Sequence, residues 1–221
     1  MEKTFWKDPY QNTLHTKVAA INSGELVLEK TIAFSFSGGQ ESDKAFINGI
    51  EIISSRIEGN LIYYKLPEGH GIQVHDEVIM TIDWPRRYRL MRLHFAAELI
   101  LELVTRTHHL EKSGAHISES KARIDFKSDT NISSIFDALL VEYNAIIKDD
   151  LPIYKGYSDE VNQRRFWRIE GFAEVPCGGT HVNSTAEVGL VHLKRSHPGK
   201  SLERIEIKLV DEHTPKPEQL D

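Results

Sequence analysis

Two pairs of side chains in this chain have the residue types and the spacing of metal ligands. His94 and Glu98 are four residues apart in a segment with helical periodicity, so they share one helix face with Cβ atoms about 5–6 Å apart. Cys177 and His181 are also four residues apart, and two glycines lie between them. Such a segment can wrap a thiol and an imidazole around one ion. The sequence therefore offers four candidate ligands for a metal such as zinc.

Each pair also has an ordinary interpretation. A histidine on an apolar helix is commonly a hydrogen-bonded core residue, and Glu98 has the spacing of a solvated charge ladder with Glu102 and Arg106. Cys177 is the single cysteine, so it cannot form an internal disulfide and its thiol is free. That thiol can ligate a metal or act as a nucleophile with His181 as its base.

The elements that position these groups fall into two regions. Short apolar runs separated by turn residues extend from about residue 16 to residue 83, and Asn48-Gly49 between two of them is a strong hairpin signal. We expect paired strands near residues 17–21, 25–29, 44–47, 50–53, 61–64 and 78–82. Because closure removes exposed strand edges, these strands predict a small N-terminal β-barrel.

The pattern changes at Trp84-Pro85, where proline ends the strand. A helix over residues 86–106 follows, with apolar residues around almost its whole circumference, which is typical of a buried helix. We expect a hairpin (115–118 and 122–126), an amphipathic helix capped by Asn131, and strands near 151–154, 166–169, 188–193 and 202–210. The fold class is therefore α+β, with domains over 1–83 and 84–211 and a flexible tail over 212–221.

Composition narrows the class of protein further. The chain has 221 residues, 40% of them hydrophobic, and a net charge of -6. No run approaches the roughly 18 apolar residues of a membrane helix, and the first residues have no signal-peptide core, so we expect a cytoplasmic protein without membrane contact. An acidic protein needs a local basic patch to bind RNA. The candidates are Arg92 on the long helix and Lys194, Arg195 and Arg204 near the final hairpin.

Three segments together resemble one known family. Residues 174–189 (EVPCGGTHVNSTAEVG) resemble the second zinc motif of the editing domain of alanyl-tRNA synthetase and of the free-standing AlaX trans-editing proteins. Residues 92–99 resemble the first zinc motif, which in the family is His-x-x-x-His on a long helix. Residues 36–43 (FSGGQESD) are similar to the Gly-Gly-Gly-Gln loop that faces the editing pocket. The order and spacing match from about residue 30 to residue 209.

The resemblance implies a fold, a reaction and a site. It implies a β-barrel domain followed by a two-layer α+β editing domain, which binds Zn²⁺ and hydrolyses the ester between a wrong amino acid and the acceptor end of alanine tRNA. Serine and glycine each differ from alanine by one small group, which a synthetic pocket discriminates poorly. Gln40, with the backbone of Gly38 and Gly39, is the candidate for lining the pocket, and we give Gln40 and Glu98 catalytic roles.

Two departures from the family leave alternatives open. Ser37 replaces the first glycine of the loop, and Glu98 stands where the family has its second helical histidine. Glu98 as the fourth ligand, beside His94, Cys177 and His181, is the favoured interpretation. Otherwise Glu98 is a general base beside a three-ligand metal, or the substitution weakened metal binding. In that last case a non-catalytic, metal-stabilised RNA-binding module competes with the deacylase, and a hydrolase of other aminoacyl esters is a further alternative.

Overall fold

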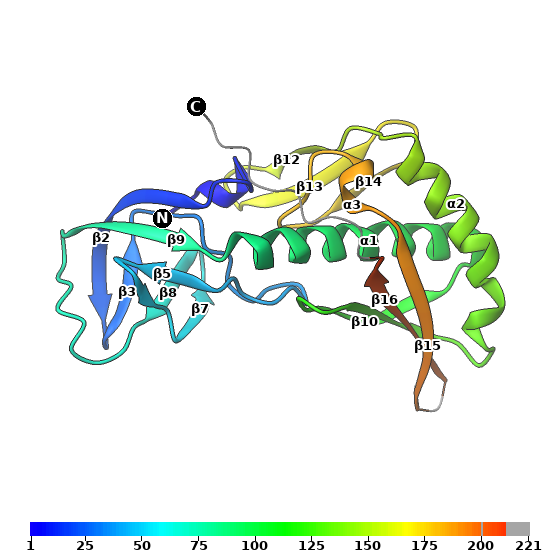
Figure 1. Ribbon diagram of the computed structural model, residues 1–221, viewed down its shortest axis with the longest axis horizontal. Coiled ribbons are helices and arrows are strands. Elements are labelled where there is room, and N and C mark those ends of the chain that lie inside the picture. Colours follow the sequence, from blue (N-terminus) through cyan, green and yellow to red (C-terminus); the bar gives the residue numbers. More distant parts are fainter. Residues whose placement is uncertain (200, 211–221) are drawn as a thin grey trace.

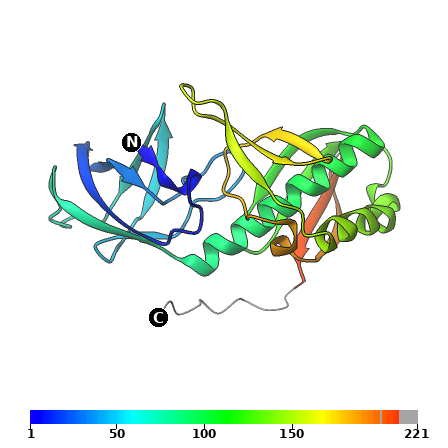
Figure 2. The same cartoon turned by 90° about the horizontal axis from the view of Figure 1, so that it is seen from above.

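The computed structural model describes residues 1–199 and 201–210, and the predicted tail, residues 212–221, lies outside them. The chain has the predicted α+β class, with one long helix beside several antiparallel sheets (Figure 1). In Figure 2 an N-terminal sheet lies beyond the first turn of that helix, and the remaining elements surround the helix.

The N-terminal sheet has seven strands in the order β6-β5-β9-β2-β3-β8-β7. The predicted hairpins are confirmed: β2 turns into β3 at Ser23-Gly24, and β5 turns into β6 at Asn48-Gly49. Strand β7 was not among the expected strands. The strands are β2 (Thr13–Asn22), β3 (Glu25–Leu28), β5 (Ala45–Ile47), β6 (Ile50–Glu51), β7 (Ser54–Glu58), β8 (Leu61–Lys65) and β9 (Glu77–Ile82).

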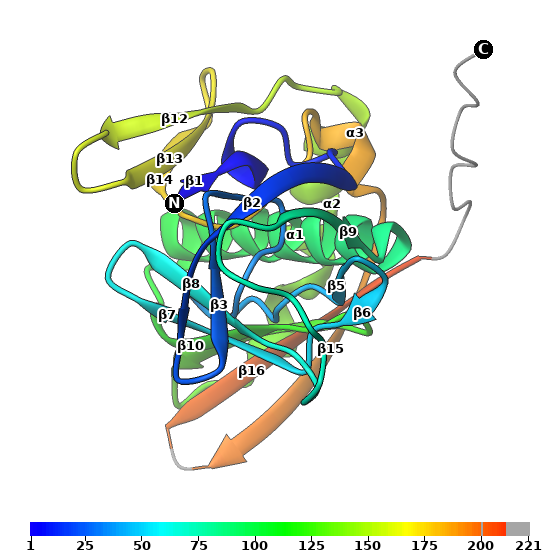
Figure 3. The ribbon, with the colours of Figure 1, turned by 90° about the vertical axis from the view of Figure 1, so that its left-hand side faces the viewer.

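This sheet curls into a half-barrel and does not close, which corrects the predicted β-barrel (Figure 3). Its two ends, β6 and β7, pair with no further strand within the described residues. The edges are protected in another way. β6 has two residues, and β7 carries Arg56 in ion pairs with Glu25 and Glu58. Short and charged edges make closure unnecessary.

A single residue, Asp83, separates β9 from the long helix α1 (Trp84–His108). The Asp83 side chain accepts a hydrogen bond from the Arg86 amide and so caps the helix, and Pro85 lies in the first turn. His109 closes the other end in a left-handed conformation. No helix in the described part of the chain has the length and apolarity needed to cross a membrane.

Helix α1 lies between two sheets, so the region has three layers where two were expected (Figure 1). On one side is the sheet β10-β11-β16-β15, whose residues Ile124, Ile205 and Ile207 are buried in the same core as α1. On the other side is the sheet β12-β13-β14, whose Trp167 packs edge-on against Phe95 of α1. The additional layer arises because α1 is apolar around nearly its whole surface and one sheet cannot cover it.

The remaining boundaries refine the expected ones. Asn131 caps a 3₁₀ turn, η2 (Ile132–Ile135), that leads into helix α2. The expected strand at 151–154 begins later, and the expected strand at 188–193 is preceded by a short helix, α3. The elements are β10 (Glu111–Ile117), β11 (Ala122–Lys127), α2 (Phe136–Lys148), β12 (Tyr154–Asp159), β13 (Arg164–Ile169), β14 (Ala173–Pro176), α3 (Thr185–Val188), β15 (Val191–Gly199) and β16 (Leu202–Leu209), with β1 (Glu2–Lys3), η1 (Thr4–Trp6) and β4 (Lys30–Thr31) near the N-terminus.

A buried ion pair joins α1 to the N-terminal sheet. The Arg87 guanidinium is fully buried and pairs with Asp43, and its Nε lies 2.8 Å from Asp43 Oδ1. Arg87 also donates to the carbonyl oxygens of Pro9 and Ile32, at 3.0 and 2.5 Å. Because all these partners are desolvated, removal of either charge would leave the other one unpaired. The pair therefore fixes the segment around Asp43, which follows directly on the glycine-rich loop, against α1.

Candidate metal centre

The loop from Cys177 to His181, which we call the metal loop, leaves β14 and leads toward α3. Its first residue remains tied to the sheet, because the Cys177 amide donates to the Arg165 carbonyl at 2.9 Å. Its second residue is tied to the N-terminal segment, because Trp6 Nε1 donates to the Gly178 carbonyl at 2.8 Å. Two structural elements distant in sequence therefore hold the start of the loop.

Gly179 allows the metal loop to lie directly against α1. A Cβ atom at this position would be 2.0 Å from His94 Cε1 and 2.9 Å from Gln40 Oε1. Both side chains are buried, so neither can move away at low cost. The second glycine of the motif is therefore needed for close approach.

Three of the predicted ligands converge. Cys177 Sγ lies 3.5 Å from His94 Nε2 and 3.3 Å from His181 Nε2, and the ligand atoms of these three residues all lie within 4.8 Å of one another. Tetrahedral zinc, with bonds of about 2.3 Å to sulfur and 2.05 Å to nitrogen, holds such atoms roughly 3.5 Å apart. The donor set and its spacing therefore fit a zinc ion.

Glu98 lies beside this group, although it is not one of the three residues whose ligand atoms all converge. Its Oε1 is 3.2 Å from His94 Nε2 and 3.6 Å from Cys177 Sγ. Its Oε2 accepts a hydrogen bond of 3.1 Å from Trp167 Nε1. One carboxylate oxygen is therefore held by the indole and the other faces the donors. The sequence analysis missed Trp167, since nothing in its local pattern distinguishes it from a core residue.

The charges of the metal-free site follow from these contacts. Burial lowers the pKa of His94, but Cys177 and Glu98 outweigh burial and raise it to about 10. Burial raises the pKa of Glu98, but the bond to His94 lowers it to about 2. For His181, burial and the neighbouring His94 hold the pKa well below its usual value. His181 is therefore neutral, whereas His94 would have to release a proton for a metal to bind.

Gln40 contacts His94, one of the candidate ligands. Its side chain is fully buried, and its Oε1 lies 2.6 Å from His94 Nδ1. The orientation of the amide follows from Thr180, whose backbone N–H donates to Oε1 and whose Oγ1 accepts from Nε2. His94 Nδ1 therefore carries a proton and donates it to Gln40, so Nε2 points toward Cys177 as the metal-binding atom. The sequence predicted that Gln40 lines the substrate pocket, and no local pattern indicated its contacts with Thr180.

The glycine-rich loop forms a tight turn that accommodates the serine. The amide of Ser37 donates to the Gln40 carbonyl at 3.3 Å, and the Gln40 amide donates to the Ser37 carbonyl at 3.0 Å. The two residues between them, Gly38 and Gly39, have positive φ values, whereas Ser37 does not. A Cβ on Gly39 would also lie 2.6 Å from the Ala115 carbonyl oxygen. Serine in place of the first glycine is therefore compatible with the turn.

We expect Gln40→Ala to weaken zinc binding by about 10- to 100-fold, because His94 then loses the acceptor that orients its ring. Gln40→Glu keeps an acceptor at the same place and should retain most of the affinity. Chelator competition measures both affinities, and Gln73→Ala is a control at an exposed glutamine. Equal affinity in Gln40→Ala and the wild-type protein would show that Gln40 does not orient the ligand.

The candidate RNA-binding residues lie in different surroundings. Arg92 is 9% exposed and donates to the Val188 carbonyl at 3.0 Å, which places its guanidinium between α1 and α3. Arg195 makes two hydrogen bonds of 2.6 Å to Glu203. Arg204 pairs with Asp125 on the outer side of the sheet, and Lys194 is exposed beside it on β15. Arg92 is therefore covered by α3, Arg195 and Arg204 are both ion-paired and partly exposed, and Lys194 is exposed.

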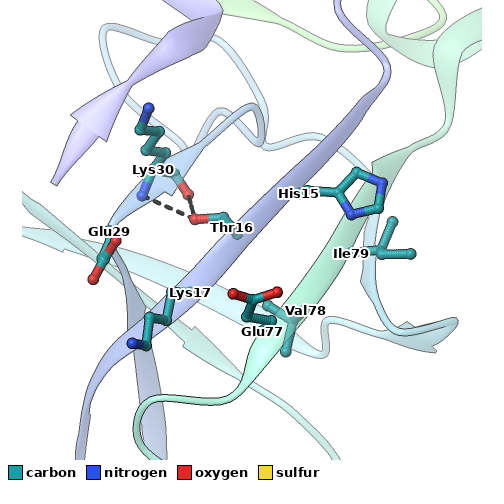
Figure 4. Close-up of a pocket in the computed structure, with 8 residues that line it drawn as sticks. All are labelled: His15, Thr16, Lys17, Glu29, Lys30, Glu77, Val78 and Ile79. Carbon is teal, nitrogen blue, oxygen red and sulfur yellow. Dashed lines mark hydrogen bonds between the residues drawn. The ribbon is translucent and has the colours of Figure 1, made fainter.

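A separate hollow lies on the N-terminal sheet, over β2 and β9 (Figure 4). It is lined by His15, Thr16, Lys17, Glu29, Lys30, Glu77, Val78 and Ile79. The Thr16 hydroxyl bonds the backbone of Lys30 there. Its two lysines and two glutamates balance one another, and it contains none of the predicted site residues.

Comparison with known proteins places the chain among tRNA-editing sequences. Residues 165–206 match the family described as the threonyl and alanyl tRNA synthetase second additional domain. Alanyl-tRNA editing protein AlaX-M of Pyrococcus horikoshii is 30% identical over 213 residues, which cover 94% of this chain and 97% of that protein. AlaX-M of Saccharolobus solfataricus is 32% identical, covering 92% and 97%. Alanine-tRNA ligase of Methanococcus aeolicus is 27% identical, covering 93% of this chain and 25% of the ligase.

Proposed function

Because the chain belongs to the AlaX family of alanyl-tRNA editing proteins, we propose that it is an aminoacyl-tRNA deacylase that removes wrong amino acids from alanine tRNA in trans. It would serve translation quality control in the cytoplasm. The observation that carries the proposal is the convergence of His94, Cys177 and His181 on one point. The glycine-rich loop supports it, since it supplies Gln40 to the same group.

The metal of this proposal is zinc, held by His94 Nε2, Cys177 Sγ and His181 Nε2. A thiolate with two imidazoles is a donor set that suits zinc. When bound there, the ion supplies Lewis acidity that polarises an ester carbonyl or a water molecule. The chain itself orients His94 through Gln40 and excludes solvent from both histidines, which are at most 4% exposed.

We assign Glu98 as the fourth ligand. Glu98 Oε1 shares a hydrogen bond with His94 Nε2, and if that nitrogen held a metal, Oε1 would lose this partner and would be free to ligate. Its separations of 3.2 and 3.6 Å from His94 Nε2 and Cys177 Sγ suit neighbouring ligands on zinc, and ligation would bring Glu98 closer to His181, with which it does not yet converge. The bond from Trp167 to Oε2 supports binding through one oxygen.

The substrate of the proposed reaction is alanine tRNA carrying serine or glycine at its acceptor end. Water adds to the ester carbonyl carbon, and the bond to the ribose oxygen breaks, so that free amino acid and tRNA are released. We propose that the turn at Gly38 and Gly39 faces the substrate, because Gly38 is exposed while the adjacent Gln40 reaches His94. A site with polar groups for the serine hydroxyl rejects alanine, which would leave those groups unpaired.

We also propose a domain boundary between residues 83 and 84. Two separate buried cores support it, one built from residues between Phe5 and Ile82 and the other from residues between Leu90 and Leu209.

The test is a deacylation assay on alanine tRNA charged with serine, glycine or alanine. We expect rapid hydrolysis of the serine or glycine ester, sparing of the alanine ester, loss of activity with a chelator and recovery on addition of zinc. Metal analysis should find about one zinc per chain. Zinc binding without hydrolysis of any ester would instead identify a metal-stabilised binding module.

The same assay separates a thiol hydrolase, which the 3.3 Å contact between Cys177 Sγ and His181 Nε2 would permit. A thiol enzyme keeps its activity after chelation and loses it on alkylation of Cys177. A metal-dependent enzyme would instead lose its activity on chelation. It would resist alkylation of Cys177 while zinc was bound, because the metal would shield the sulfur. Cys177 Sγ contacts two imidazoles, His94 and His181, whereas a thiol nucleophile needs one base. The arrangement therefore favours a metal site.

A further inference from the structure

The four-stranded sheet β10-β11-β16-β15 has one face turned away from α1, which we call the outer face. Ala122, Ile124, Ile205 and Ile207 are buried on the α1 side, so the residues that alternate with them point outward. The register aligns them across the sheet. Arg123 lies opposite His116 and Glu206, and Glu206 lies opposite Lys194. Arg204 lies opposite Asp125, and Lys208 lies opposite His192.

The outer face is positive, whereas the chain as a whole has a net charge of -6. Its central part carries five cations, Lys121, Arg123, Lys194, Arg204 and Lys208, against two anions, Asp125 and Glu206. The carboxylates lie beneath the cations that they pair with. The side chains of Asp125 and Glu206 are 13% and 14% exposed, whereas those of Lys121, Arg123 and Arg204 are 39%, 32% and 23% exposed. An approaching molecule therefore meets the cations first.

This face reaches the metal centre through the glycine-rich loop. The loop extends the sheet alongside β10, because the Ile117 amide donates to the Gly39 carbonyl at 2.8 Å and the Glu41 amide donates to the Ile117 carbonyl at 3.0 Å. Gln40 projects from this edge to the inner side, toward His94. Arg86 pairs with Glu41 there and neutralises it.

An exposed aromatic residue marks this junction. The Phe36 side chain begins the loop segment and is 55% exposed. Its ring lies 6.3 Å from that of His116, the outward-facing residue before Ile117. An exposed aromatic ring at the edge of a basic surface is typical of sites on which unpaired nucleotides stack.

We infer that the outer face docks the acceptor-stem duplex of the tRNA and that Phe36 receives an unpaired nucleotide on the way to the metal centre. The inference rests on the proposed function. Four strands about 4.8 Å apart give a surface roughly 15 Å wide, which suits one side of an RNA duplex. Apart from Leu202 at its end, the outer face carries charged, polar and small side chains in the described strands, which matches phosphate contacts better than a protein interface. Double-stranded RNA is recognised mainly through such contacts.

The test compares two triple variants in binding uncharged alanine tRNA. The first is Arg123→Gln, Lys194→Gln and Lys208→Gln. The matched control is Arg56→Gln, Lys65→Gln and Lys148→Gln, which also removes one ion-paired arginine and two exposed lysines. For the first variant we expect roughly 10- to 100-fold weaker binding. The slope of log affinity against log salt concentration should also be shallower by about 2, since each lost phosphate contact lowers the magnitude of this slope by about 0.7–0.9. The control should bind like the wild-type protein.

A short substrate distinguishes a loss of tRNA docking from damage to the metal centre. The first variant should hydrolyse serine esterified to a CCA trinucleotide at the wild-type rate, whereas Phe36→Ala should reduce kcat/KM on this substrate by about 10-fold. Wild-type affinity and salt slope in the first triple variant would overturn the inference, as would an equal loss in the control. Binding of uncharged tRNA does not require hydrolysis. A wild-type protein that binds tRNA through this face and hydrolyses no ester would therefore contradict the proposed function alone.

Discussion

Cys177→Ser is expected to abolish hydrolysis of alanine tRNA carrying serine and to remove the bound zinc. The Cys177 sulfur is the atom that lies within 3.5 Å of both histidine nitrogens, and a serine hydroxyl is a far weaker ligand than a thiolate. We expect metal content to fall from about one equivalent to nearly zero, and the single-turnover rate to fall by roughly 10³-fold or more. His181→Ala should have the same effect, because it removes a buried donor from the same group.

The controls separate loss of metal from loss of fold. His15→Ala changes an exposed histidine on β2 and should leave zinc content and activity intact. Circular dichroism and thermal melting of Cys177→Ser with and without added zinc show whether the variant remains folded. A folded, metal-free Cys177→Ser protein with full activity would show that the metal hypothesis is wrong.

The second large effect concerns Glu98, at the position where the zinc motif that this segment resembles has a histidine. As the fourth ligand, Glu98 contributes to zinc affinity, so Glu98→Gln should bind zinc at least 10-fold more weakly. Glu98→His should restore a family-like ligand and keep much of the activity. Zinc affinity by chelator competition and single-turnover deacylation, measured on both variants, test this expectation. Glu102→Gln is the matched control, one helical turn further along α1.

Other results for these two variants would give Glu98 a different role. If Glu98 is a general base, Glu98→Gln should bind zinc as tightly as the wild-type protein and hydrolyse the ester about 10²-fold more slowly. Glu98→His should then also be impaired. Unchanged affinity and unchanged rate together would make Glu98 a carboxylate held by Trp167 with no part in the reaction.

Local sequence was enough to predict the elements whose stability comes from near neighbours. The hairpin at Asn48-Gly49, the cap of η2 by Asn131 and the start of the long helix next to Pro85 all depend on residues within a few positions of one another. The candidate ligands were also evident, since spacing of four residues on a helix or across two glycines places two donors together. These contacts need no knowledge of the remaining chain.

The tertiary structure decided which distant segments meet, because packing and not local spacing sets those contacts. Gln40 and His94 are 54 residues apart, and the sequence predicted Gln40 as a pocket residue without predicting its hydrogen bond to a candidate ligand. Trp167 reaches Glu98 over 69 residues. Arg92 has the sequence context of an exposed basic residue, yet α3 covers it. The N-terminal sheet stays open because its short and charged edges are already protected, and that protection depends on which strands become the edges.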